Sequence, residues 1–134
     1  MSLSHRLLIL LALVLPALAV RAQAPTPTIV TPLVSKDLPG IAGKEGSMVM
    51  VSYAPGASSA SHRHNASTFV YVLEGSVVMQ VKGGAQVTLK QGETFYETPD
   101  DIHTVSKNAS ATQPAKILVF FVKDKGAAAT VPAN

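Results

Sequence analysis

The sequence predicts an all-β domain, either a sandwich or a barrel, on three observations. Short segments rich in valine, phenylalanine and tyrosine recur along the chain, and these residue types favour strands. Turn signals built from glycine, proline and aspartate separate the segments at intervals of about 8 to 12 residues, a spacing typical of sandwiches and barrels. No segment offers an apolar stripe at the period of an amphipathic helix.

In chain order we expect an extended lead-in, one domain and a loose tail. The lead-in at residues 23–35 carries three prolines among threonines, which oppose a helix. The domain at residues 36–125 includes a β-hairpin that turns at Gly83-Gly84. The tail at residues 126–134 is alanine-rich and lacks core-forming side chains. The expected strands are Ser47–Tyr53, Thr68–Leu73, Ser76–Val81, Gln86–Leu89, Thr94–Glu97, Ile102–Ser106 and Lys116–Val122.

The N-terminus has the layout of a secretory signal peptide. Arg6 precedes an apolar run at residues 7–15, and small residues follow the run. We prefer cleavage after Ala22 over cleavage after Ala19 or Ala24, and we expect a periplasmic or secreted protein. An uncleaved anchor is the alternative, but the run is shorter than the approximately 20 residues of a spanning helix. Because the chain has no cysteine for a lipid or a disulfide, we expect no stable membrane anchor and a true hydrophobic core.

Charge argues against nucleic acid as a partner. Removal of a signal at residues 1–22 leaves 112 of the 134 residues, enough for one domain. Arg6 and Arg21 leave with the signal, so 9 of the 11 basic side chains remain against all 8 acidic ones. A net charge near +1, with Arg63 as the only remaining arginine, provides no basic surface for a phosphate backbone.

Three histidines remain after the signal, in two short segments, and their spacing suits a metal. In an extended chain, His62 and His64 point to the same face about 6.6 Å apart. A metal binds an imidazole nitrogen at about 2.0 to 2.1 Å, so a neighbouring strand that brings His103 would complete a three-histidine site. In the alternative, all three are neutral core histidines, each of which needs separate hydrogen-bond partners.

The first histidine segment resembles the first signature of the cupin superfamily. That signature has a glycine, a His-x-His pair, a glutamate and a second glycine at fixed spacing. Gly56, His62, His64 and Gly75 occupy the corresponding positions here, and Thr68 stands where the glutamate would be.

The second histidine segment resembles the second cupin signature, and 16 residues separate it from the first. Gly92 and His103 match the signature. Thr98 and Asp100 replace its usual proline and glycine, and Asn108 comes one residue later than the pattern asks. The resemblance covers most of the chain after the signal.

This resemblance implies a single-domain cupin-type jelly-roll β-barrel that holds a divalent metal. The metal ligands would be His62, His64 and His103, together with the glutamate that Thr68 replaces. The family also implies a homodimer. Three neutral imidazoles without the carboxylate favour zinc, iron, nickel or copper over manganese, and Thr68 could hold a water on the metal. The alternative is a cupin that kept the fold and lost the metal.

Several further residues are candidates for the pocket. If Thr68 faces the cavity, the period of two places Val70 and Val72 on an apolar wall. Glu93 and Glu97 are the nearest substitute carboxylates, as ligand or general base, although acidic residues beside turns are usually solvated. The candidate pocket and outer-sphere residues are Thr68, Val70, Val72, Gln80, Glu93, Tyr96 and Glu97.

Two functions remain open at this stage. The first is a metal-dependent enzyme, an oxygenase, isomerase or lyase, that acts on a small organic molecule. The second is a non-catalytic periplasmic module that binds a small molecule or a metal. The sequence shows no phosphate-binding glycine loop, nucleophile elbow or cysteine nucleophile that would indicate other chemistry.

Overall fold

A computed structural model describes residues 28–133, and within this range it shows ten strands and no helix. The expected signal at residues 1–22 and the start of the lead-in, residues 23–27, lie outside the described residues. No helix in the described part of the chain has the length and apolarity to cross a membrane. The strands are β1 (Thr28–Asp37), β2 (Lys44–Tyr53), β3 (His62–His64), β4 (Ala66–Glu74), β5 (Ser76–Val81), β6 (Val87–Lys90), β7 (Thr94–Glu97), β8 (Ile102–Asn108), β9 (Ala115–Asp124) and β10 (Thr130–Pro132).

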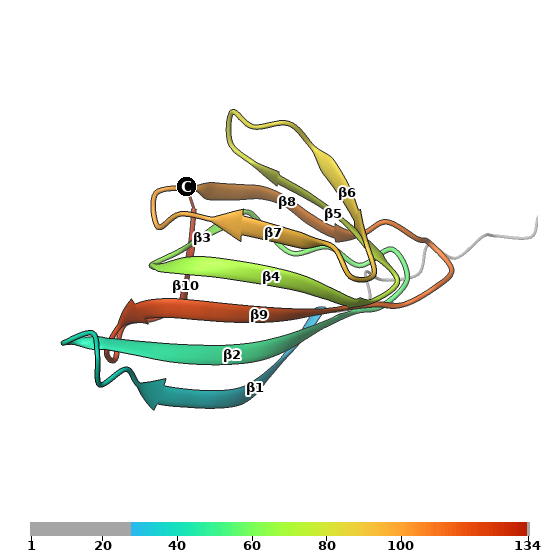
Figure 1. The fold of residues 1–134 in the computed structure, drawn as a ribbon. Helices are drawn as coiled ribbons and strands as arrows, with labels where there is room; N and C mark the ends of the chain where they lie inside the picture. Colours follow the sequence, from blue (N-terminus) through green and yellow to red (C-terminus); the bar gives the residue numbers. More distant parts are fainter. Residues whose placement is uncertain (1–27, 134) are drawn as a thin grey trace, which may run out of the picture.

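The strands form two five-stranded antiparallel sheets, which confirms the all-β class (Figure 1). The first sheet has the order β1-β2-β9-β4-β7 and the second has the order β10-β3-β8-β5-β6. Several neighbours in a sheet are far apart in sequence, as with β2 and β9, which pair along ten residues. The two histidine segments, β3 and β8, therefore become direct neighbours in the second sheet.

The core lies between the sheets and follows the period of two along each strand. In β4, positions 66, 68, 70 and 72 are buried while Phe69 and Tyr71 are exposed, and β9 alternates in the same way. The inward positions of the first sheet are mostly apolar, so a shift of its register by one residue would expose apolar side chains and bury polar ones. The main contributors are Val51, Tyr53, Val70, Val72, Val77, Met79, Ile117, Val119 and Phe121.

All seven expected strands are present, each within three residues of its expected ends. Ser76–Val81 and Thr94–Glu97 have the expected bounds, and the first of them pairs with β6 in the predicted hairpin. The structure adds strands where the sequence predicted only extended or loose chain. These are β1, β3 and β10.

The lead-in is part of the first sheet rather than a separate segment. β1 pairs with β2 from Thr28 to Asp37, and the register shifts between Pro32 and Val34. Because β1 is an edge strand, Pro32 can lack an amide proton without breaking the sheet. Pro32, one of the three prolines that argued against a helix, is therefore compatible with an edge strand.

The expectation of a loose tail is wrong for residues 130–132. These residues form β10, which pairs with β3 in register from Thr130 opposite His64 to Pro132 opposite His62. Backbone pairing, which needs no large side chain, holds this part of the alanine-rich tail in place. The tail therefore lies against the histidine pair.

Gly75 makes the link between the two sheets. It is the single residue between β4 of the first sheet and β5 of the second, with φ of 70°. A Cβ at this position would stand 2.5 Å from the carbonyl oxygen of Pro114. The signature glycine thus provides both a left-handed backbone and room for the chain that enters β9.

Asn108, the late residue of the second signature, holds two loops together. Its side-chain amide donates to the carbonyl oxygens of Ala54 at 3.1 Å and Gln113 at 2.8 Å. Its side-chain oxygen accepts from the backbone N–H of Ser110 at 2.8 Å. Asn108 therefore has a structural role at the end of β8.

Candidate metal centre

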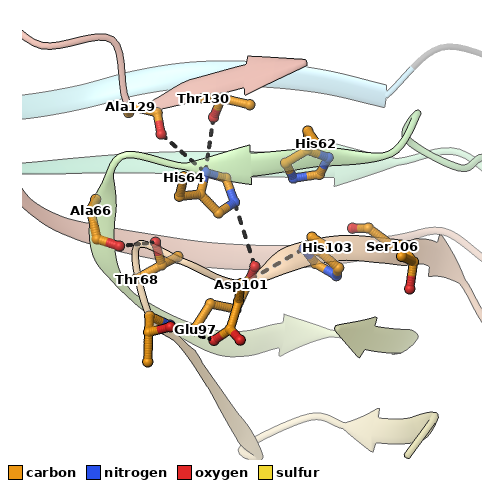
Figure 2. Close-up of polar contacts among 12 residues, drawn as sticks. His62, His64, Ala66, Thr68, Glu97, Asp101, His103, Ser106, Ala129 and Thr130 are labelled. Carbon is orange, nitrogen blue, oxygen red and sulfur yellow. Dashed lines mark hydrogen bonds and ion pairs between the residues drawn. The ribbon is translucent and has the colours of Figure 1, made fainter. Parts of the chain in front are cut away.

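Two neighbouring strands of the second sheet, β3 and β8, bring the histidines together (Figure 2). β3 lies between β10 and β8, and His62 stands directly opposite His103. The nitrogens that His62, His64 and His103 offer as ligands all lie within 4.8 Å of one another. The sequence spacing thus correctly predicted that the three side chains would meet.

The spacing of these nitrogens fits a shared ion. Two imidazole nitrogens bonded to one metal stand at most about 4.2 Å apart. Side-chain rotations that move the ring nitrogens by less than about 1 Å would bring all three to one ion. The ring centroid of His62 lies 4.8 Å from that of His64 and 5.0 Å from that of His103, so no side chain separates the rings.

Backbone carbonyls orient two of the rings. Nδ1 of His62 lies 2.8 Å from the carbonyl oxygen of Ala60. Nδ1 of His64 lies 3.2 Å from the carbonyl oxygen of Ala129 and 3.1 Å from the hydroxyl of Thr130. A carbonyl only accepts, so each Nδ1 carries the proton and each Nε2 keeps its lone pair for a metal. Metal-binding histidines are commonly held by this outer hydrogen bond.

Of the three histidines, His103 gives the strongest indication of a bound metal. Its side chain is 3 % exposed, and neither ring nitrogen has a hydrogen-bond partner among the described residues. Buried polar atoms in proteins almost always have partners, because an unpaired one costs about 1 to 3 kcal/mol. A ligated ion would satisfy a nitrogen of this ring, so the donor set fits a bound metal.

Glu97 joins the histidines from the opposite sheet. It ends β7, is 1 % exposed, and places Oε1 at 3.2 Å from Nδ1 of His103 and Oε2 at 4.0 Å from Nε2 of His64. The expectation that such a glutamate is merely solvated is wrong for Glu97. The alternation of β7 directs it inward, and the turn after it does not expose it.

Burial dominates the electrostatics of His64. It lowers the pKa of this ring below the usual 6.5, because a charged imidazolium would lose its hydration, and the nearby Glu97 carboxylate opposes the shift. The ring therefore stays neutral, the form that binds a metal, in more acidic solution than a free histidine does.

We expect the metal-free protein to lose stability as the pH falls below about 6.5. In that range the unfolded chain protonates His64 while the folded chain resists it, so acid favours unfolding by at most about 1.4 kcal/mol per pH unit. Urea unfolding between pH 8 and pH 5 would measure the slope. The slope should flatten in His64→Gln, and an unchanged slope in that variant would contradict the prediction.

A cavity of about 470 Å³ lies beside the histidines. Its wall is largely apolar, with Val49, Val70, Met79, Ile117 and Phe121 among the lining residues. Such a volume is in the range of small-molecule sites. The site therefore combines a set of metal ligands with space for an organic ligand.

A hydrogen-bonded pair adds polarity to this cavity. The hydroxyls of Tyr53 and Ser106 lie 2.7 Å apart and both residues line the wall. Burial raises the pKa of Tyr53, so the phenol keeps its proton and remains able to donate a hydrogen bond.

Five polar residues that line this cavity were not predicted from the sequence: Tyr53, Ser59, Ser61, Ser106 and Thr130. Alternation from Val51 points to Tyr53, so this signal was present. Ser106 was hidden, because a register shift at Thr104 places positions 103 and 106 on the same face, which strict alternation forbids. Thr130 was hidden by its place in the tail.

Of the apolar wall residues expected from β4, Val70 lines the cavity. Thr68 and Val72 also face inward and are fully buried, but they lie outside the cavity wall. The hydroxyl of Thr68 donates to the carbonyl oxygen of Ala66 at 3.4 Å, within its own strand.

Gln80, Glu93 and Tyr96 do not belong to the pocket, and these expectations are corrected. Gln80 follows the inward Met79 and donates to the Gly84 carbonyl oxygen in the hairpin turn. Glu93 is exposed and accepts from a backbone N–H in the turn before β7. Because Glu97 faces inward, the adjacent Tyr96 faces outward and is 49 % exposed.

Comparisons with known proteins agree with this architecture. The family model of the cupin domain matches residues 49–121. No curated protein matches the sequence. A conserved uncharacterised protein with a double-stranded β-helix domain from Klebsiella pneumoniae is similar at 20% identity and a TM-score of 0.62, over 84% of this chain and 90% of that one. A cupin-like protein from Thermotoga maritima also gives 20% identity and 0.62, over 78% and 74%.

A third similar structure is an enzyme. The DMSP lyase DddQ from Ruegeria pomeroyi aligns at 18% identity with a TM-score of 0.58. The alignment covers 66% of this chain and 43% of the lyase, so the chain spans less than half the length of that protein. At this identity the likeness concerns the fold alone.

Proposed function

Because the chain belongs to the cupin domain family, we propose that it binds a divalent transition metal and acts on a small organic molecule in the adjoining cavity. The ligands would include His62, His64 and His103. The convergence of these three imidazoles beside a cavity of about 470 Å³, with both nitrogens of His103 unpartnered among the described residues, carries the proposal. The enclosing structure would be the family's jelly-roll barrel.

Different residues around the cavity would bind different parts of the organic ligand. The apolar wall would hold a carbon skeleton and exclude water, while Tyr53 and Ser106 would orient polar groups through their hydroxyls. A bound metal would supply a Lewis acid for a ligand oxygen. The reaction would be of oxygenase, isomerase or lyase type, and a lyase is among the proteins of similar fold.

We also propose an exported protein that works as a homodimer, in the periplasm or outside the cell. Export rests on the signal expected at residues 1–22. The outer face of the first sheet carries exposed Phe69, Tyr71 and Tyr96 next to Leu118 and Phe120. Large exposed apolar patches mark interfaces, and one self-complementary patch is enough for a two-fold dimer, so a second copy would pack here.

A non-catalytic binding module is the second candidate. The apolar character of most of the cavity wall favours it, because a chemical step needs polar groups near the ligand. The two candidates differ in whether the metal keeps an exchangeable position.

Cobalt loading of the purified protein, followed by azide, tests the proposal. We expect about one cobalt per chain by elemental analysis and a change in the visible spectrum when azide takes the open position. A loaded site whose spectrum ignores azide would favour the binding module. Less than about 0.2 cobalt per chain after loading would refute metal binding itself.

A further inference from the structure

We propose that Glu97 is the fourth metal ligand and that it supplies, from the neighbouring strand, the carboxylate missing at position 68. This inference rests on the proposed function, because it assumes that the three histidines hold a metal. It assigns to Glu97 a role that neither cupin signature gives to its position. The placement of the carboxylate, the absence of a hydrogen-bond partner for its Oε2 among the described residues, and the strand register all support this role.

The carboxylate of Glu97 stands at the separation expected of two ligands on one ion. Donors bonded at about 2.1 Å and subtending 90° to 109° lie about 3.0 to 3.4 Å apart. Oε1 of Glu97 lies 3.2 Å from Nδ1 of His103, and the other oxygen is 4.0 Å from Nε2 of His64. The carboxylate therefore lies against two of the three proposed ligands (Figure 2).

The 3.2 Å contact with His103 does not meet the geometry of a hydrogen bond, since both nitrogens of that ring are unpartnered within the described part of the chain. Oε2 of Glu97 is likewise buried without a hydrogen-bond partner among the described residues. A buried ionised carboxylate requires a compensating charge or donors. A cation between Glu97 and His103 would satisfy both groups at once.

Strand register explains why a glutamate at position 97 can replace one at position 68. Thr68 on β4 is directly opposite Glu97 on β7, and both side chains are buried on the inner face. Directly opposite residues have Cβ atoms about 4.5 to 5.5 Å apart. A glutamate side chain from either strand can therefore reach the same region. The carboxylate that the signature places on β4, at position 68, is supplied here by the opposite residue on β7, at position 97.

A fourth ligand of this kind changes the expected metal. The preference for zinc, iron, nickel or copper over manganese followed from three neutral ligands. The Glu97 carboxylate offsets one unit of the ion's charge and adds a hard oxygen donor. Manganese and ferrous ions therefore become suitable for this site.

The competing role for Glu97 is that of a positioning residue, which would accept a hydrogen bond from Nδ1 of His103 and leave Nε2 for the metal. Glu97→Gln separates the two roles. The amide oxygen can still accept that hydrogen bond, but the negative charge and the preferred oxygen ligand are lost.

We expect Glu97→Gln to raise the Kd for Mn²⁺ more than a hundredfold in calorimetric titration, beyond the roughly ten- to hundredfold that loss of an outer hydrogen-bond partner costs. The Kd for Cu²⁺ should rise much less, because imidazoles suit copper. Glu93→Gln is the matched control, since Glu93 is exposed in the turn before β7 and should leave both values unchanged.

The double variant Thr68→Glu/Glu97→Thr then tests the cross-strand exchange. We expect it to recover Mn²⁺ affinity to within about tenfold of the wild type, because the carboxylate returns from the opposite strand. If the wild type binds Mn²⁺ and Glu97→Gln binds it with the same Kd, this inference alone would be overturned. Failure of the wild type to bind Mn²⁺, Cu²⁺ or cobalt would instead overturn the proposed function.

Discussion

His103→Ala should abolish stoichiometric metal binding. Structural metal sites bind with about 10 to 16 kcal/mol, so one of four ligands contributes roughly 3 kcal/mol, which is a hundredfold or more in Kd. His103 is the only proposed histidine ligand from β8, and the other two come from β3. Its loss leaves no histidine ligand on the β8 side of the ion, so the site is open there. Elemental analysis should show a fall from about one metal per chain to below about 0.2.

Two companion variants separate metal loss from damage to the fold. His103→Phe keeps a planar ring, somewhat larger than imidazole, without a ligand nitrogen, so it should fold with a metal-free stability lower by at most about 1 to 3 kcal/mol and lose the metal. Thr104→Ala removes an exposed neighbour on the same strand and should keep the metal. Retention of a full metal complement in both His103 variants would show that this ring is not a ligand.

Gly75→Ala should destabilise the protein by about 2 to 5 kcal/mol. A side chain at φ of 70° costs about 1 to 2 kcal/mol. The new Cβ would also stand 2.5 Å from the Pro114 carbonyl oxygen and 3.1 Å from Cα of Ala115, and overpacking adds about 1 to 3 kcal/mol. Both contacts are with backbone, so the start of β9 would have to move. Typical domains are stable by only about 5 to 15 kcal/mol, so much of the protein could unfold.

Gly83→Ala is the control for this variant, to be measured by urea unfolding alongside it. Gly83 has φ of 80°, but a Cβ added there would have no atom of the described chain within 4 Å. Gly83→Ala should therefore lower the free energy of unfolding only by the cost of a side chain in the left-handed region, about 1 to 2 kcal/mol. Equal losses in the two variants would mean that the close approach of Pro114 has no energetic effect.

The periodic parts of this fold were predictable from sequence because one physical rule governs them. Alternation indicated strands such as Thr94–Glu97, and the His-x-His spacing placed His62 and His64 on one face. The hairpin at Gly83-Gly84 followed from its turn chemistry. These signals are local, so a single sequence contains them in full.

The parts that were missed depend on contacts between distant segments. β10 exists because β3 offers it an edge, and Ser106 faces the cavity because of a register shift opposite Gln80. The inward position of Glu97 follows alternation within β7, but its partnership with Thr68 required knowing that β7 pairs with β4. The sequence indicated Glu97 as a candidate carboxylate, and only the strand pairing distinguished it from Glu93.

The C-terminal strand also bears on how the protein should be handled. Ala129 and Thr130 hold Nδ1 of His64, and β10 lies alongside β3. A chain shortened before Ala129 would retain every coordinating residue in its sequence, yet the ring of His64 would lose its outer restraint. Such a truncation would therefore resemble a ligand defect in any binding assay, although no ligand had been removed.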